Sequence, residues 1–278
     1  ALENGFTYMN SLFNNYRDHE LVSITVDPHS VYTCSPELLV RLGEQATKQD
    51  ALYVIHLSET TDEVNGCKVQ HGCSPVMHLD RLGLLNERVV ADHCVVLSDE
   101  DIALLERRGV KVAHCPESNM KLASGASPIP QLMEAGVVVG LGTDGSASNN
   151  DVDMFGEMNS AAKLHKAIHG DPTVMSAENT LRAATMGGAT VLGRNNDLGS
   201  LEVGKKADFI VLDLDKPHLT PLYNPTSHLV YAANGSDVIH SVINGRLVMR
   251  DRILTTLDEK EIIGEMKAIA VEIGKIMS

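Results

Sequence analysis

Five short apolar runs, rich in β-branched residues, recur along the first half of the chain, and each ends in polar residues. Continuous apolar runs of this length are typical of strands that are buried on both faces, as in a parallel sheet. The pattern therefore predicts five strands, at 21–30, 51–59, 88–96, 110–119 and 136–146.

Helical patterns with start signals lie between these runs. Ser35 before a proline predicts the start of one helix, and Ser98 before three acidic residues predicts another that stops at Gly109. Two further helices are expected at 150–169 and 174–193, the second rich in Ala and Gly and suited to close packing. Strands that alternate with helices at this spacing indicate βαβ units, and hence the α/β fold class.

From about residue 200 the pattern changes to short alternating runs. Two of them surround Asn244-Gly245, a strong signal for a type I′ hairpin. Residues 258–278 carry apolar side chains at helical spacing and are expected to dock as an amphipathic helix. We therefore divide the chain into a βα region at 1–200, a small β region at 201–257 and this C-terminal helix.

The composition narrows the classes of partner. The 278 residues are 43% apolar and 22% charged, and no 18-residue apolar run could span a bilayer. A net charge of −14 without a basic stripe argues against nucleic acid. Five cysteines without a CxxC pair argue against a zinc ribbon or a disulfide scaffold, and the opening residues show no secretory signal. We expect a cytoplasmic protein that binds neither membranes nor nucleic acid.

Reactive side chains gather where the predicted strands end. In a parallel barrel all carboxyl ends of the strands open on one face, so residues remote in sequence converge there. The positions are His29, His56 with Glu59, His93, Ser118 with Asn119, and Asp144.

Imidazole and carboxylate groups are both ligands for first-row metals, so His56, His93 and Asp144 together favour a metal site. The alternatives are buried histidines satisfied by backbone carbonyls and an aspartate that caps a turn. Glu59 can hand a proton to a substrate, or else favour a helix N-terminus. His93 could instead shuttle a proton, and His29 could donate to a substrate ring or ribose.

Several enzyme classes lack support in this sequence. It contains no GxSxG, P-loop or GxGxxG motif, and no HxE…PCxxC pattern of the cytidine-deaminase type. His114 lies inside a predicted strand and is expected to be structural, and the remaining histidines have no converging partners in the sequence.

Six stretches together resemble the amidohydrolase superfamily, specifically the 5-methylthioadenosine/S-adenosylhomocysteine deaminase group. They are PHSVYTCSPELL, HLSET, DHCVVLSDEDI, HCPESNMKLASG, GLGTDGSASNNDVDMFGEM and GSLEVGKKADFIVLD, in order from about residue 22 to 250. The resemblance implies a metal-dependent (β/α)8 barrel beside a small β-sandwich. Residues 1–200 would then be a partial barrel and 201–257 a partial sandwich.

The resemblance also implies roles for five residues. His56 and Asp144 would bind one divalent metal, zinc in the first place, with iron, manganese or nickel as alternatives. Glu59 would protonate the purine ring and bind substrate, and His29 would bind substrate. His93 would assist proton movement, and Asp144 would accept a proton from the attacking water. The implied reaction converts the adenine ring of methylthioadenosine, adenosylhomocysteine or adenosine to hypoxanthine and ammonia.

The sequence departs from the family pattern in one respect. Members carry a His-x-His pair at the end of the first barrel strand, and no HxH occurs here. Five βα units are predicted where a barrel has eight. We expect the C-terminal portion of a longer enzyme, with weak metal binding by itself and with a missing N-terminal segment or a homo-oligomer partner to complete it, because open sheet edges favour association.

Two other functions stay open at this point. The same site could act on another ring, such as guanine, cytosine or a triazine, where the leaving group is an amine or chloride. The chain could instead be an inactive fragment or scaffold that keeps the fold without the metal. Substrate screening would distinguish the first alternative from a nucleoside deaminase. A measurement of metal content would test the second.

Overall fold

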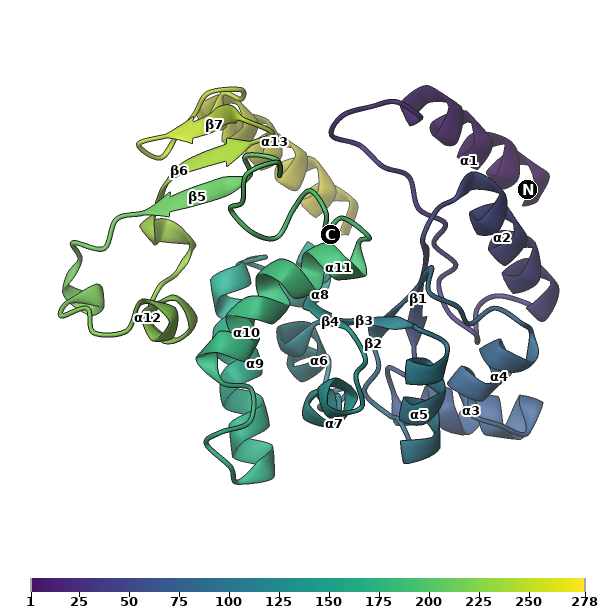
Figure 1. Cartoon of the computed structure of the whole chain (residues 1–278). Coiled ribbons are helices and arrows are strands. Elements are labelled where there is room, and N and C mark those ends of the chain that lie inside the picture. Colours follow the sequence, from purple (N-terminus) through teal and green to yellow (C-terminus); the bar gives the residue numbers. More distant parts are fainter. Residues whose placement is uncertain (1, 278) are drawn as a thin grey trace.

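A parallel sheet of four strands forms the centre of the first part of the chain. The structure, a computed structural model, describes residues 2–277, so the outermost residues of the regions 1–200 and 258–278 lie outside it. The strands are β1 (Tyr53–Leu57), β2 (Val89–His93), β3 (Lys111–His114) and β4 (Val139–Leu141), in the order β1-β2-β3-β4. Figure 1 shows this sheet between α2 to α5 at one end and α9 to α11 at the other.

The first of the five expected strands, 21–30, is wrong as a strand and is reduced to a parallel bridge between Val26 and Tyr53. Val26 donates its N–H to the Leu52 carbonyl, and Val54 donates to the Val26 carbonyl. The next donor on this side would come from Pro28, which has no N–H, so the ladder cannot continue. The other four predicted strands are confirmed, although each is shorter than its apolar run.

Helices follow the strands, as the alternation predicts. Ser35 accepts a hydrogen bond from the N–H of Leu38, and Ser98 forms a capping box with Asp101, so both predicted helix starts are confirmed. The helices of this part are α1 (Leu2–Tyr16), α2 (Pro36–Gln49), α3 (Thr61–His71), α4 (Pro75–Arg81), α5 (Asp99–Arg107), α6 (Pro116–Lys121), α7 (Ile129–Glu134), α8 (Ser146–Asn149), α9 (Met154–His169) and α10 (Ala177–Arg182).

The Ala/Gly-rich stretch packs closely on the last strand of the sheet, as expected. It continues α10 through a π-helical turn, η1 (Ala183–Gly187), into α11 (Gly188–Val191). A Cβ atom added at Gly187 would run into the backbone carbonyl of Val139, whereas one added at Gly188 would meet only an ordinary contact. Gly187 therefore lets a helix approach β4 more closely than any larger residue would allow.

The core lies between the parallel sheet and its helices. Alternate strand residues such as Ile55 and Leu57 are fully buried against Leu39 of α2, Leu79 of α4 and Leu105 of α5 within one apolar cluster. This cluster fixes the strands from the helical side and leaves their carboxyl ends free to carry polar side chains. Among residues 2–277, the structure contains no helix that is both long and apolar enough to cross a membrane.

A second, antiparallel sheet follows residue 200. Its strands are β5 (Phe209–Leu212), β6 (Val238–Ile243), β7 (Arg246–Arg250) and β8 (Ile253–Leu254), in the order β5-β6-β7-β8. The short helices η2 (Pro217–Leu219), α12 (Pro225–Tyr231) and η3 (Gly235–Asp237) lie between β5 and β6. Asn244 and Gly245 both have positive φ, at 49° and 75°, which confirms the predicted hairpin turn. The structure shows one antiparallel sheet here, and both the expected partial sandwich and the region boundaries at 200 and 257 stay predictions.

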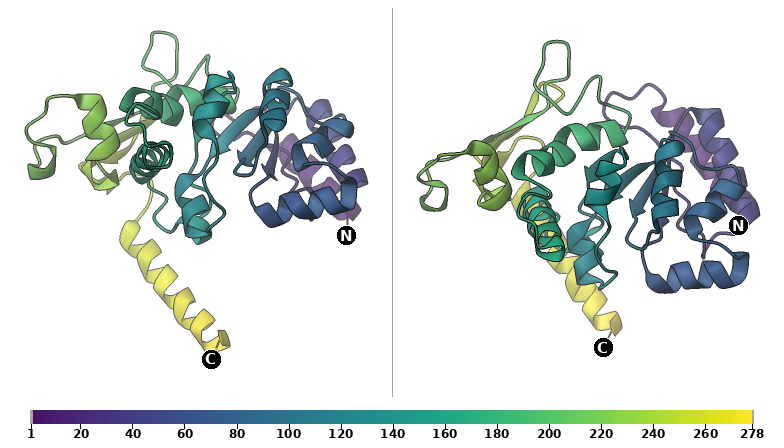
Figure 2. Two further views of the ribbon diagram at one scale, coloured as in Figure 1. Left: turned by 90° about the horizontal axis from the view of Figure 1, so that it is seen from below. Right: turned by 60° about the horizontal axis from the view of Figure 1, so that its bottom comes forward.

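The C-terminal helix forms but is not docked in this structure, which differs from the expectation for 258–278. Helix α13 (Glu259–Met277) extends away from the rest of the chain (Figure 2). Every residue from 259 to 276 is exposed, including Ile262, Met266 and Ile269 on its apolar face. The amphipathic pattern specified the helix, but no partner for its apolar face lies among residues 2–277.

We predict that Gly187→Ala destabilises the protein by about 1–3 kcal/mol, because the new methyl group overlaps a backbone carbonyl that cannot move aside easily. The free energy of unfolding from urea titration measures the effect. Gly188→Ala is the matched control and should be neutral or stabilising by up to about 1 kcal/mol, since Ala is the better helix former. Equal effects of the two substitutions would contradict the close approach.

Candidate active site

Several polar residues at the strand ends have a positive φ, which residues other than glycine rarely adopt. Ser58 after β1, His93 at the end of β2 and Asp144 after β4 have φ of 53°, 69° and 60°. Such residues cluster at functional sites because the surrounding structure must hold them there. One such restraint is visible at Cys94, whose carbonyl accepts a hydrogen bond from the buried hydroxyl of Ser127.

Three of the predicted histidines lie side by side. The ring centroids of His29 and His56 are 4.9 Å apart, and those of His56 and His93 are 5.3 Å apart with nearly parallel rings. His56 Nδ1–H donates to the backbone carbonyl of His29 at 2.8 Å. A carbonyl can only accept a hydrogen bond, so the neutral His56 ring carries its proton on Nδ1. The lone pair of Nε2 is then free for a ligand.

Asp144 is held as a carboxylate beside these rings. Ser118 Oγ–H donates to its Oδ2 at 2.6 Å, and the N–H of Gly145 donates to its Oδ1 at 2.6 Å. Burial by itself would raise the pKa of Asp144, but these bonds and the nearby His93 outweigh it and hold the pKa below its usual range. The negative charge available to a metal or proton at this position is therefore preserved.

Glu59 lies just beyond the end of β1, as its sequence position predicts. Its backbone N–H donates to Glu63 Oε2 at 2.7 Å, and Ser58 N–H donates to Glu63 Oε1 at 3.0 Å. Ser124 Oγ–H donates to the Glu59 carboxylate at 3.2 Å. The structure thus brings all five predicted residues to the same edge of the sheet, where β1, β2 and β4 end.

The sequence interpretation places Asn119 at a strand end without giving it a role, and it does not include Ser124 or Asp92. Asn119 Oδ1 lies 2.9 Å from His93 Nδ1, and Ser124 contacts Glu59. Asp92 pairs in register with His56, and burial raises the pKa of its carboxyl group. A charged residue inside an apolar run was a sequence signal for Asp92. No sequence pattern pointed to Ser124.

His114 is structural, as expected. It is fully buried and lies with its Nε2 atom 3.1 Å from Nε2 of His165. One ring must donate and the other accept, so the accepting ring is neutral. Burial lowers the pKa of each, to about 4 for His165.

A buried carboxyl group connects the loops that carry the site. Glu157 of α9 is fully buried, accepts a hydrogen bond from the N–H of Glu117 at the start of α6, and accepts a second from the side chain of Asn149. Burial raises the pKa of Glu157 to about 8, and the nearby Glu117 carboxylate adds to the shift. Glu157 therefore joins the segment after β3 to the segment after β4.

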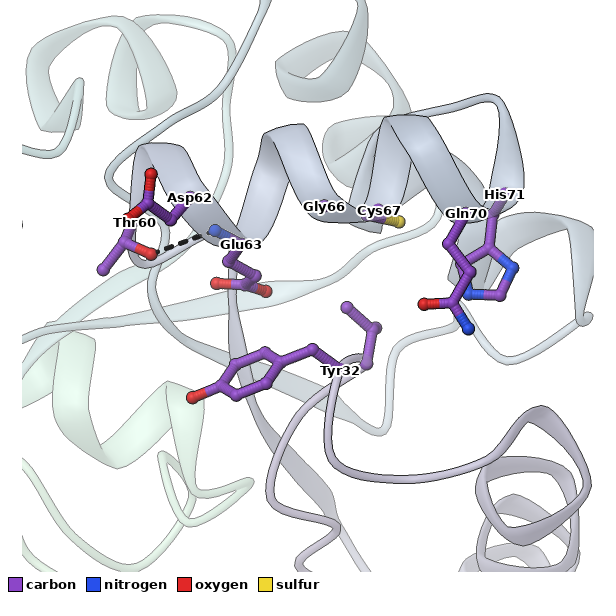
Figure 3. Close-up of a pocket in the computed structure, with 9 residues that line it drawn as sticks. Tyr32, Thr60, Asp62, Glu63, Gly66, Cys67, Gln70 and His71 are labelled. Carbon is purple, nitrogen blue, oxygen red and sulfur yellow. Dashed lines mark hydrogen bonds between the residues drawn. The ribbon is translucent and has the colours of Figure 1, made fainter.

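A pocket of about 380 Å³ lies beside the strand ends, between the loop after residue 29 and helix α3. Figure 3 shows Tyr32 opposite Glu63, with Cys67 and Gln70 further along the same wall. None of the five candidate residues lines this pocket, although Tyr32 packs edge-on against the His29 ring. We place the chemistry at the converging strand ends, where the titratable groups meet, rather than in this pocket.

His56 and Asp144 suit a divalent metal, because one offers a free imidazole nitrogen and the other a carboxylate. Within residues 2–277, however, no three His, Cys, Asp or Glu side chains form a group that could hold a metal ion. The two residues could therefore supply two of the three protein ligands that such a site normally has.

Parallel strands in sequential order, each followed by helices and carrying imidazole or carboxylate groups at their carboxyl ends, are typical of the (β/α)-barrel class of protein. The chain matches the amidohydrolase family over residues 12–248 and belongs to that family. This finding agrees with the resemblance drawn from the six sequence stretches.

Curated relatives share about half of the residues. A 5-methylthioadenosine/S-adenosylhomocysteine deaminase of Syntrophobacter fumaroxidans is 53% identical over 97% of this chain and 61% of its own length. A 5'-deoxyadenosine deaminase of Methanothermobacter thermautotrophicus is 47% identical over 91% of this chain and 58% of its own. The chain thus spans about three fifths of the length of these relatives.

Solved structures show the same fold. An adenosine deaminase from Xanthomonas campestris with bound zinc superposes with a TM-score of 0.95 at 40% identity, covering 97% of this chain and 62% of that one. A mutant atrazine chlorohydrolase from Arthrobacter aurescens, complexed with zinc and atraton, superposes with a TM-score of 0.89 at 27% identity. The match covers 96% of this chain and 60% of that one. The expected fold class is confirmed.

We predict that Glu157→Gln changes the pH dependence of stability. The folded-state pKa of about 8 lies above the ordinary value of 4.5, so the neutral form stabilises the fold at low pH and this contribution is lost as pH rises towards 8. Glutamine cannot ionise. The variant should therefore match the parent near pH 5 within about 1 kcal/mol and exceed it by roughly 2–4 kcal/mol at pH 9.

Urea unfolding at several pH values measures this difference, with the exposed Glu106→Gln as the matched control. A constant offset between Glu157→Gln and the parent across the pH range would show that Glu157 does not titrate in this window.

Proposed function

We propose that this chain carries a large part of the active site of a hydrolytic deaminase that acts on the adenine ring of 5-methylthioadenosine, S-adenosylhomocysteine or adenosine. The observation that carries the proposal is the convergence of His56, His93 and Asp144 with Glu59 at one edge of the sheet. The names of relatives at 43–53% identity support this substrate class.

The chain's own residues suit each proton transfer in such a reaction. Glu59 gives a proton to a purine ring nitrogen, which makes C6 more electrophilic, and Asp144 accepts a proton from the attacking water. His93 assists these transfers beside Asp144, and His29 donates to the nucleoside. The C6–N bond then breaks, so one water and the adenine ring give hypoxanthine and ammonia.

His56 and Asp144 would hold a divalent metal, for which the zinc in two solved relatives makes zinc the first choice. When bound, such an ion would lower the pKa of a coordinated water to about 7. Iron, manganese or nickel are alternatives, because sites of histidine and carboxylate ligands accept each of them.

We propose further that a segment outside this chain completes the site. The chain supplies two metal ligands, and the relatives are longer by about two fifths of their length. A His-x-His strand would provide the remaining ligands, and three more βα units would cover the open edge of the sheet beside β1. The five cysteines are all free, which supports a reducing cytoplasm as the location.

A triazine hydrolase is the second candidate, because several solved relatives with TM-scores of 0.88–0.89 carry that activity in their names. Their identity to this chain is 27–28%, compared with 53% for the first deaminase relative. The nucleoside is therefore the favoured substrate class.

We predict that co-expression with the N-terminal portion of the Syntrophobacter fumaroxidans relative yields a complex that releases ammonia from methylthioadenosine, adenosylhomocysteine or adenosine. Loss of adenine absorbance together with an ammonia assay measures the reaction. Release of chloride from atrazine without nucleoside turnover would favour the triazine candidate. A metal-free complex without either activity would favour a scaffold.

Within that complex, Glu59→Gln should lower kcat by about 10²–10⁴-fold, because glutamine cannot hand over a proton. The metal content should stay the same, since Glu59 is not a proposed ligand. His56→Ala should instead lower the metal content measured by mass spectrometry of the intact metal-bound protein. The exposed Glu106→Gln is the matched control and should change neither quantity.

A further inference from the structure

One short segment contacts three of the proposed catalytic side chains. It comprises residues 115–124, from the end of β3 through α6, and is called here the β3–α6 segment. Its contacts are Asn119 Oδ1 with His93 Nδ1 at 2.9 Å, Ser118 Oγ with Asp144 Oδ2 at 2.6 Å, and Ser124 Oγ with Glu59 Oε1 at 3.2 Å. These three partners come from the ends of three different strands.

The β3–α6 segment is held rigidly at both ends. Ser118 and Asn119 are fully buried, and the N–H of Glu117 is bound by the carboxylate of Glu157. The N–H of Ser124 donates to the Asn119 carbonyl at 2.9 Å, which closes the turn after α6. Side chains with fixed backbone anchors can orient their partners, because they have little freedom of their own.

We propose that Asn119 is a positioning residue that selects the tautomer of His93. Its Oδ1 atom accepts a hydrogen bond from Nδ1–H of His93 and so keeps Nε2 unprotonated. This inference rests on the proposed function, in which His93 assists proton movement. An imidazole can take up a proton only at a bare nitrogen, and that nitrogen must not be the one already bound to Asn119.

The charge around His93 favours this orientation of the amide. When Nε2 takes up a proton, the ring becomes positive, and an amide oxygen at Nδ1 stabilises that charge while an amide NH₂ would repel it. The Asp144 carboxylate lies close enough to interact with the same ring. The amide oxygen of Asn119 and the carboxylate of Asp144 therefore both face the His93 ring with negative or partially negative atoms.

The other end of the Asn119 amide points to a role beyond stability. Its Nδ2 atom is buried and has no hydrogen-bond partner within the described part of the chain. An unsatisfied buried donor costs free energy, so a position selected for stability alone would not keep it. An asparagine that orients a catalytic ring explains why this residue type stands here.

The tautomer can be measured on this chain without any assay of activity. Long-range ¹H–¹⁵N NMR spectra of the labelled protein, at a pH where His93 is neutral, should show a protonated Nδ1 and a bare Nε2. His93→Gln identifies the His93 signals by their loss. Asn119→Ala should give a mixture of tautomers, whereas Asn119→Asp retains an acceptor and should keep Nδ1 protonated.

The exposed Asn196→Ala is the matched control and should leave the His93 signals unchanged. A bare Nδ1 in the parent protein, or an unchanged tautomer in folded Asn119→Ala, would overturn the proposal. If Asn119→Ala does not fold, the parent spectrum and that of Asn119→Asp still decide the question.

In the complemented enzyme, Asn119→Ala should lower kcat by about 10–100-fold with little change in KM, and Asn119→Asp should restore part of the loss. The pH profile of kcat should also shift in Asn119→Asp, because the variant places a charged carboxylate instead of a neutral amide against the His93 ring. If Asn119 had a purely structural role, kcat would fall equally in both variants and the pH profile of kcat would stay unchanged. Failure of the parent complex to deaminate any nucleoside would refute the proposed function, while the NMR result would stand.

Discussion

The parallel register of β1 to β4 is the constraint on which the site depends. Since adjacent strands run in the same direction, their carboxyl ends meet at one edge, and His56, His93 and Asp144 gather there although they are up to 88 residues apart in sequence. The helices bury the opposite side chains of the same strands in one apolar cluster, which fixes the register. The helix-covered face of the sheet thus provides stability, and the carboxyl ends of its strands carry the candidate residues.

Around that edge, polar groups fix the tautomer of His56 and the charge of Asp144. The His29 carbonyl fixes the proton of His56, and the Ser118 hydroxyl keeps Asp144 charged. Glu157 of α9 accepts hydrogen bonds from the segment after β3 and from the segment after β4, and so connects them. This arrangement also explains why residues in strained conformations persist here, because several hydrogen bonds determine each of them.

Large apolar surfaces remain uncovered within the described residues. The apolar face of α13 is exposed, as are Phe209, Ile210 and Val211 of β5. A single chain normally buries such faces, since exposed patches of this size favour association. The chain spans about three fifths of the length of its relatives, so the uncovered faces agree with the proposal that a further segment completes the fold.

The sequence alone determined the βα alternation, the helix caps, the hairpin and the five candidate residues, because these depend on local propensity and on the position of a residue at a strand end. It predicted a strand at 21–30, where Pro28 limits pairing to a bridge, and a docked C-terminal helix whose partner face is not among residues 2–277. Only the tertiary structure decided which side chains contact the candidate residues or hold the loops that carry them. Asn119, Ser124 and Glu157 act through contacts with residues 26 to 65 positions away, and no local pattern encodes such contacts.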